Sequence, residues 1–496
     1  MALSFTQDPV DTTGNLVPVL TNWTPVIGYM LWRNTSIAAL FYYRLVLEVK
    51  IDNSSGTLIA KMKQRRNGNS FDITNNYARA LFNLKDIVNS QIVNTEFDSN
   101  YTTTPKRKPI HTVGKNTTTK PFSRSGDDII EKPQLIKIYV KGYENYSASA
   151  SASPADVTTD SINDTRYWLA ASFPLEYPRY DGSAYIQSSA FEDYTQSYHT
   201  DKFLSDIARY YDSNLNINEY INYVQSGDYH TLAFINDTVN FASDVEFIEI
   251  AYYDSSKSLI GSKQYIENNS TNGGLTPGSG SHTEYTRLLY FGAGPGNLEA
   301  STVTPSGGSA GDAQPSNFAN WAYYTIRATS TATPTGDGNY KTRTYYFIKQ
   351  DGSCKGFAIR RLAWINTKGG WDYFNFKMKS KRTLDISRNN YSTVLGIFNG
   401  EKYSYENTAR GSRTRQVTAI QKEIIQTDWI SEEEGQLLEN LFLSSNVNII
   451  ENSDTTYSYP VLITDKNFIK KSVANDGVKI RYTINIEYAN PVNTNS

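Results

Sequence analysis

The chain has 496 residues, which is enough for roughly two to four domains with a substantial core. It contains 37 Tyr, 21 Phe and a single Cys, and its formal net charge is −2. This charge gives no general attraction to nucleic acid or to a membrane surface, and one cysteine excludes an intrachain disulfide framework. The fold must therefore be held by side-chain packing and strand pairing.

The N-terminus has neither the basic residues nor the apolar run of a secretory signal. The most apolar early stretch, residues 37–49, is interrupted by Arg44 and Glu48 and is too short to span a bilayer. We expect the protein to be made and folded in a cytoplasm, without membrane contact.

Residues 1–146 are predicted to form a β-rich domain. Alternation over 41–51, a turn at 52–56 and a second apolar run at 57–62 predict a hairpin. A helix is expected next, because Thr74 or Asn75 can cap it and apolar residues follow at helical spacing, namely Tyr77, Leu81, Leu84 and Val88. The polar stretch 99–120 is expected to be a contact loop or arm, and 135–140 a further strand.

Residues 147–159, rich in Ser and Ala, have the composition of a linker. A central domain is expected over 160–340, with short strands such as 245–253 in a sandwich-like arrangement. Within it, the Gly, Ser, Thr and Pro content of 267–283 and 292–319 is typical of long surface loops.

A third, C-terminal β domain is expected over 341–496. Strands are predicted at 345–350 and on both sides of a turn at Gly369–Gly370, and later at 458–464 and 479–488. Ser431 and Glu434 form a capping-box pattern that begins a helix, whose apolar face comprises Leu437, Leu438, Leu441 and Phe442. The predicted fold class is therefore mainly β: several antiparallel sandwich-like modules with a few short helices.

Candidate chemical sites are few. Gly292, Gly294 and Gly296 resemble a phosphate loop, but Pro295 and the absence of a following helix with Lys favour a flexible loop. No pair among His111, His199, His230 and His282 has metal-ligand spacing, although Asp228 could orient His230.

Two carboxylate clusters could be considered for glycoside hydrolysis. Residues 432–434 are explained by helix capping, and Asp127–Asp128 lies in an expected turn. Cys354, with no His nearby, is expected to be a small buried residue. We therefore expect no enzyme activity, no catalytic residue, no cofactor and no metal.

Three basic clusters occur, at 61–66, 106–108 and 377–382. Alternation in the first and last favours exposed cations that protect strand edges, with subunit or DNA contact as the minor alternative. The aromatic residues are spread along all strands, so core packing explains most of them. A local carbohydrate site is left open.

Several segments resemble structural proteins of tailed bacteriophages. They are residues 361–376 (RLAWINTKGGWDYFNF), 381–386, 427–441 (TDWISEEEGQLLENL), 459–464 and 482–490, together with the N-terminal strand–turn–strand and 71–74. They cover about half of the chain, and the central domain is outside the resemblance.

The resemblance implies a non-enzymatic virion structural protein, most simply a tail or baseplate subunit in a symmetric ring or hub. Two alternatives remain: a head or neck component, and a carbohydrate-binding tail adhesin. The expected partners are further copies of the chain, other virion proteins and, for an adhesin, host surface glycans. Nucleic acid is not expected as a partner.

Overall fold

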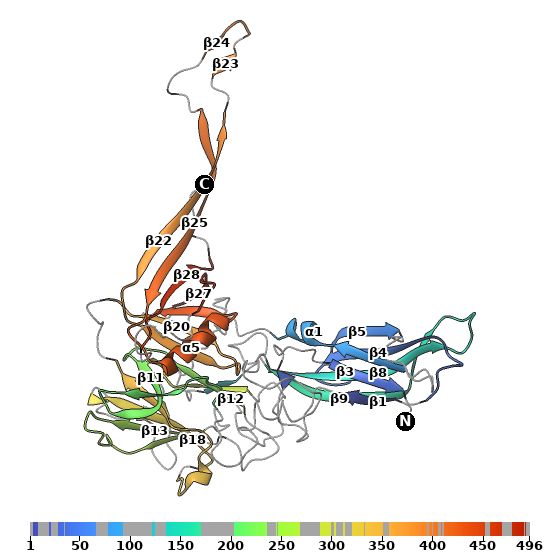
Figure 1. Ribbon diagram of the computed structural model, residues 1–496, viewed down its shortest axis with the longest axis horizontal. Coiled ribbons are helices and arrows are strands. Elements are labelled where there is room, and N and C mark those ends of the chain that lie inside the picture. The colour runs from blue at the N-terminus through green and yellow to red at the C-terminus, as the bar shows by residue number, and fades with distance from the viewer. Residues whose placement is uncertain are drawn as a thin grey trace. The chain divides into compact units, whose positions relative to one another are not determined.

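The computed structural model describes the following residues: 3–7, 19–20, 28–33, 35–65, 78–92, 122–124, 135–169, 203–235, 245, 247–267, 288–298, 302–303, 311–312, 320–331, 333–350, 357–393, 396–398, 400–404, 408, 411–451, 457–468, 479–490 and 492. Two compact units are present. The first comprises Met1–Gln350 and Ile365–Asp372, and the second comprises Asp351–Trp364 and Tyr373–Ser496. The predicted mainly β class is confirmed (Figure 1).

The first unit begins with a β-sandwich. One sheet has the order β2-β9-β8-β4-β5, formed by Val19–Leu20, Ala155–Leu169, Leu135–Ser147, Phe41–Ile51 and Leu58–Arg65. The other has the order β1-β3-β6, formed by Leu3–Gln7, Gly28–Arg33 and Ala78–Asn83. One core cluster joins inward residues of both sheets, among them Leu31, Leu47 and Phe82. The predicted hairpin over 41–62 is confirmed.

The segment expected to be a linker is a hairpin turn. Strand β8 ends at Ser147 and β9 begins at Ala155. The two strands pair antiparallel, from Tyr146–Ala155 next to the turn to Leu135–Leu169 at the far end. A short Ser- and Ala-rich segment suits a tight connection because its residues are small and polar. The first sheet therefore continues well beyond the expected boundary.

The helix expected over 74–88 is wrong for residues 78–83, and residues 74–77 lie outside the described structure. Residues Ala78–Asn83 form β6, in which Ala78, Ala80 and Phe82 are buried and the alternate residues are exposed. Only Lys85–Asn89 is helical (α1). Pairing with β3 along the whole strand offered a partner that outweighed the local helical spacing.

The rest of the first unit is built on a six-stranded sheet. Its order is β10-β11-β19-β18-β13-β14, formed by Arg209–Asp212, Ile217–Val224, Tyr345–Lys349, Tyr323–Thr329, Phe247–Tyr253 and Gln264–Glu267. A sheet of order β12-β15-β7 comprises Thr231–Ile235, Leu288–Gly292 and Phe122–Arg124, and a short pair β16-β17 comprises Thr302–Val303 and Gly311–Asp312. A 3-10 turn lies at Asp337–Asn339. Because β19 lies inside this sheet, between β11 and β18, residues 341–350 belong to the first unit rather than to a C-terminal domain.

The glycine-rich segment from Gly292 is buried at its start, against the expectation of a flexible surface loop. Pro295–Leu298 form a single helical turn (α4), and all four residues are buried. A Cβ atom on Gly294 would lie 2.5 Å from the carbonyl oxygen of Asp228, so the backbones approach too closely for a side chain. These glycines therefore serve packing.

The second unit is a seven-stranded sheet covered by one helix. The order is β21-β20-β26-β27-β28-β25-β22, formed by Trp371–Phe376, Arg360–Ile365, Val447–Glu451, Tyr457–Ile463, Thr483–Tyr488, Ser412–Gln426 and Lys381–Ser392. The helix α5, Glu432–Leu443, begins with the predicted capping box of Ser431 and Glu434. Its buried leucines join the apolar face of the sheet in one core cluster. A small hairpin, β23 (Ile397–Phe398) and β24 (Tyr403–Ser404), also belongs to this unit.

Some expectations lie outside the described residues. They concern the polar stretch 99–120, the segment 268–283, Asp127–Asp128, His111, His199, His282, Cys354 and the basic cluster 106–108.

Candidate interaction surface on a beta-ribbon

One histidine candidate, His230, lies beside the glycine candidates in the core of the first unit. The backbone N–H of His230 donates to Asn297 Oδ1 at 2.9 Å, and its ring meets that of Phe347 edge-on at 5.0 Å. His230 is 2% exposed. The carboxylate of Asp228 accepts the N–H of Gln225 and closes a turn. Within the described part of the chain, no group of three or more His, Cys, Asp or Glu is arranged to hold a metal ion.

Residues 61–65 of the first basic cluster lie on β5, an edge strand, as their alternation predicts. Lys61 and Lys63 contact the carboxylate of Asp156 at 2.6 and 3.2 Å. The hydrogen bond from Lys61 is the main cause that lowers the pKa of Asp156, to about 2. These two cations are therefore engaged within the sheet.

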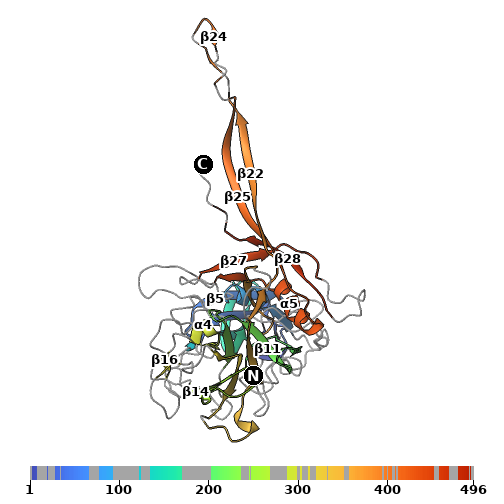
Figure 2. The same ribbon diagram turned by 90° about the vertical axis from the view of Figure 1, so that its left-hand side faces the viewer.

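The cluster at 377–382 leads into a different feature, a long two-stranded ribbon made of β22 and β25. The strands pair antiparallel from Lys381–Ile424 to Ser392–Ser412, with a bulge at Asn389–Asn390. At ~3.3 Å per residue, twelve paired residues extend about 40 Å. Figures 1 and 2 both show the ribbon leaving the sheet of the second unit.

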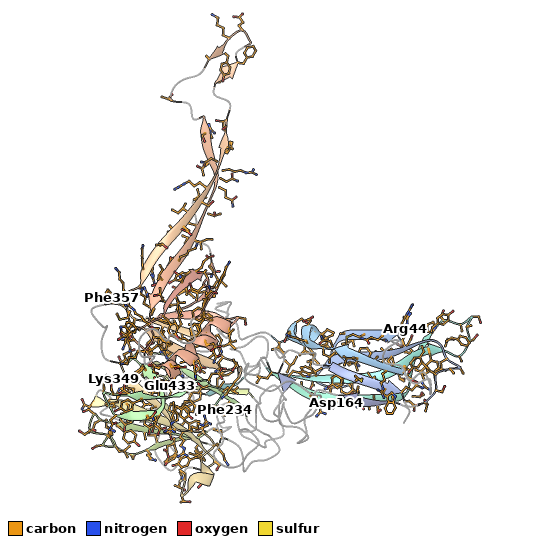
Figure 3. All side chains as sticks on the ribbon, viewed as in Figure 1. Arg44, Asp164, Phe234, Lys349, Phe357 and Glu433 are labelled. Atoms are coloured by element: carbon orange, nitrogen blue, oxygen red, sulfur yellow. The ribbon has the colours of Figure 1, made fainter. Side chains whose placement is uncertain are left out.

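The ribbon has few neighbours along its length in the described structure. All twelve residues of β22 are exposed, and β22 is the edge of its sheet. On the other side, β28 pairs with β25 only over Lys422–Gln426, and a single bridge joins Ala419 to Val492. The ribbon thus presents two faces and one strand edge for contact, and side chains stand out from both faces (Figure 3).

A buried carboxylate anchors the base of the ribbon. Glu423 is completely buried and accepts Nε–H bonds from Arg360 at 2.8 Å and Arg382 at 2.9 Å. The hydroxyl of Tyr488 donates to it at 3.0 Å. Burial alone would raise the pKa of Glu423, but the two guanidinium charges and their hydrogen bonds outweigh it, so the pKa is lowered. The carboxylate is therefore held ionised and fixes β22 to the sheet.

The two faces of the ribbon differ in character. Leu384 and Ile386 lie on one face, opposite Gln421 and Ala419, and are 48% and 47% exposed. The residues between them point to the other face, where Asp385 accepts from Lys422 at 2.6 Å. One face is therefore apolar in its middle, and the other carries the Asp385–Lys422 ion pair with Ile420 beside it.

The distal part of the ribbon is basic. Arg388, Arg413 and Arg415 lie there, whereas no Asp or Glu occurs in residues 386–392 or 412–421. Lys381, Arg382 and Lys422 bring the two strands to six basic residues against two acidic ones. The ribbon has a net charge of +4 in a chain whose total is −2, so the remainder carries −6.

The small hairpin β23-β24, between the two ribbon strands in sequence, is apolar and exposed. Ile397, Phe398 and Tyr403 are 74%, 67% and 54% exposed. A two-stranded hairpin is marginally stable in water by itself. Together, the apolar face, the basic end and these side chains form a surface suited to binding another macromolecule rather than to chemistry on a small substrate.

Reasoning from the sequence identified the edge cluster at 377–382 but missed the ribbon. A signal was present in the alternation of Leu384 and Ile386 with Thr383, Asp385 and Ser387, which predicts a strand with one apolar face. What was not readable was the partner, because β22 and β25 are separated by nineteen residues, 393–411, of mixed composition.

Compared with known proteins, the chain matches no protein-family model and no curated protein sequence. None of the helices in the described ranges is long and apolar enough to cross a membrane.

Proposed function

We propose that this chain is a non-enzymatic structural subunit of a tailed bacteriophage particle, in the tail or baseplate, where it assembles into a symmetric ring or hub. The observation that carries the proposal is the ribbon, because twelve successive exposed residues of β22 include apolar side chains that water does not favour. Such a strand pair gains its stability from a surface that covers it. The resemblance of the C-terminal segments to phage structural proteins supports the same role.

The mainly β architecture is compatible with this role. Separate core clusters in the described residues, each centred on strands and large aromatic or aliphatic side chains, make modules that stand without disulfides. Rigid modules that carry an exposed arm suit a structural component, which acts by its shape and by its contacts with neighbouring subunits.

The adhesin alternative would use exposed aromatic rings as a sugar platform. One stacked aromatic row consists of Tyr253, Tyr323 and Tyr346, whose ring centroids are 4.9 and 5.8 Å apart. Tyr323 is only 5% exposed, so this row is engaged in packing. The structural role is therefore favoured, and the head or neck position is left as the alternative location.

The test is to tag the chain in the phage that encodes it and to examine purified particles by mass spectrometry and cryo-electron microscopy. We expect the chain in stoichiometric, symmetric copies in the tail or baseplate. A second arm replaces 384–419 by a short Gly-Ser turn, which should leave the chain folded but prevent its incorporation. Absence of the chain from particles, or normal incorporation without the ribbon, would reject the proposal.

A further inference from the structure

The second unit contains an acidic counterpart to the basic ribbon. Residues 427–446 include Asp428, Glu432, Glu433, Glu434 and Glu439, and no Lys or Arg. They cover α5 and its two flanks. This segment and the ribbon are the two oppositely charged features of one sheet.

The outward side of α5 carries both charge and apolar surface. Leu437, Leu438 and Leu441 are buried against the sheet, so the stripe of Glu432, Gln436, Glu439 and Leu443, spaced at helical intervals, faces away from it. Leu443 is 62% exposed, and Trp429, just before the helix, is 55% exposed.

The ribbon cannot reach the helix of its own chain. Helix α5 packs on the sheet through the core that includes Leu362 and Ile449, whereas the ribbon extends away from that sheet in both views (Figures 1 and 2). From its anchor at Glu423, the basic end lies about 20 Å or more along the strands. A contact between the two features therefore requires two chains.

We propose that the β22–β25 ribbon of one copy docks on the outward side of α5 of a second copy. This inference deepens the proposed function by naming the partner of the ribbon. The apolar face with Leu384 and Ile386 covers Leu443, while Arg388 meets the Glu439 carboxylate. The spacing is compatible, because Ile386 and Arg388 are ~7 Å apart along a strand, and Leu443 and Glu439 are ~6 Å apart along a helix.

This arrangement has a defined symmetry. The ribbon and α5 are different surfaces. Each copy therefore binds one neighbour through its ribbon and another through its α5, in a head-to-tail arrangement. Interfaces of that kind close into rings or continue as helical filaments. The interface is expected to be sensitive to salt because its charges lie at the surface of the two elements.

The test uses the full chain with two matched double variants. Arg388→Glu/Arg413→Glu reverses charges of the ribbon, and Glu432→Lys/Glu439→Lys reverses both charges of the outward stripe of α5, leaving the capping residues Ser431 and Glu434 in place. A control, Arg65→Glu/Lys257→Glu, reverses two exposed cations in the first unit. Circular dichroism establishes folding, and analytical ultracentrifugation measures self-association at low and high salt.

We expect each double variant to weaken self-association about tenfold or more, since the attraction between Arg388 and Glu439 becomes repulsion and a neighbouring charge is reversed as well, and the control to leave it unchanged. A mixture of the two variants should assemble again, with the two variants alternating along the assembly. A single chain that carries all four substitutions should also assemble by itself. Failure of the mixture to recover, with both variants folded, would overturn the inference.

Other outcomes separate the two proposals. A chain that enters particles but does not self-associate would reject docking on α5 and leave the structural role standing. Recovery in the mixture without any incorporation into particles would support the interface and reject the phage role. The chain could instead bind double-stranded DNA, with the ribbon variant losing this binding but keeping its self-association. That result would show that the ribbon binds a polyanion and not α5.

Discussion

The hydroxyl of Ser205 donates a 2.7 Å hydrogen bond to the carboxylate of Asp372, a residue 167 positions later in the chain. The same carboxylate accepts the N–H of Asp206 at 3.0 Å and the side-chain amide of Asn366 at 3.0 Å. Asp206 in turn accepts from the N–H and hydroxyl of Thr367. The turn of the β20-β21 hairpin is thus fixed to residues 203–206 by two neighbouring carboxyl groups.

The carboxyl pair of Asp206 and Asp372 predicts that the free energy of unfolding decreases as the pH rises. Burial, and then the charge of Asp206, raise the pKa of Asp372 to about 7. Between the ordinary pKa of Asp and about 7, the folded state holds a proton that the unfolded state has released, so stability falls across this range with increasing pH. Asp372→Asn, which keeps the shape and removes the titration, should flatten the profile in urea unfolding measured from pH 4 to 8. An unchanged slope in the variant would contradict the assignment.

The close approach at the same turn gives a second prediction. A Cβ atom on Gly370 would lie 1.8 Å from the carbonyl oxygen of Leu204, whereas one on Gly336 would meet nothing within 4 Å. Gly370→Ala should therefore destabilise the first unit by at least ~1–3 kcal/mol, and Gly336→Ala should have little effect. Thermal unfolding of both variants checks this, and equal melting temperatures would show that the turn is not fixed as described.

The anchor of the ribbon gives a third prediction. Glu423→Gln removes the negative charge between Arg360 and Arg382 and should cost about 2–3 kcal/mol, less than for a fully buried pair because Arg382 is 42% exposed. Since the pKa of Glu423 is lowered, its contribution is present above the ordinary pKa of Glu and is lost as the pH falls through the folded value. Unfolding by denaturant at pH 7 and pH 3 should show a smaller difference between wild type and variant at pH 3 than at pH 7.

Helix α5 gives a fourth prediction. Leu438 is fully buried in the core of the second unit, and Gln436 of the same helix is exposed. Leu438→Ala should cost ~2–5 kcal/mol, and Gln436→Ala close to nothing. Urea unfolding of the full chain measures both, and similar effects would mean that the buried face of α5 has been misassigned.

Patterns within a few residues of one another were readable from the sequence. The capping box at Ser431, the turn at Gly369–Gly370 and the hairpin over 41–62 all depend on short-range chemistry, namely a side chain near a free N–H, a glycine that adopts positive φ, and alternation on both sides of a turn. The mainly β class follows from the same kind of observation summed along the chain.

Only the tertiary structure decided which segments meet. Residues Ala78–Asn83 carry a spacing compatible with a helix, yet they are a strand because β3 provides an edge. The parallel pairing of β11 with β19, about 125 residues apart, has no local signal, and the burial of Gly294 depends on a turn near Asp228.

The ribbon shows the same division. Its alternating residues determine that β22 is a strand with one apolar face, but its exposure depends on β28 ending its pairing at Lys422. Local propensity acts through neighbours in the chain, whereas the free energy of burial depends on surfaces that only the folded chain brings together. For this protein, the sequence determined those elements that depend on short-range patterns, and the tertiary structure decided which segments pair and which stay exposed.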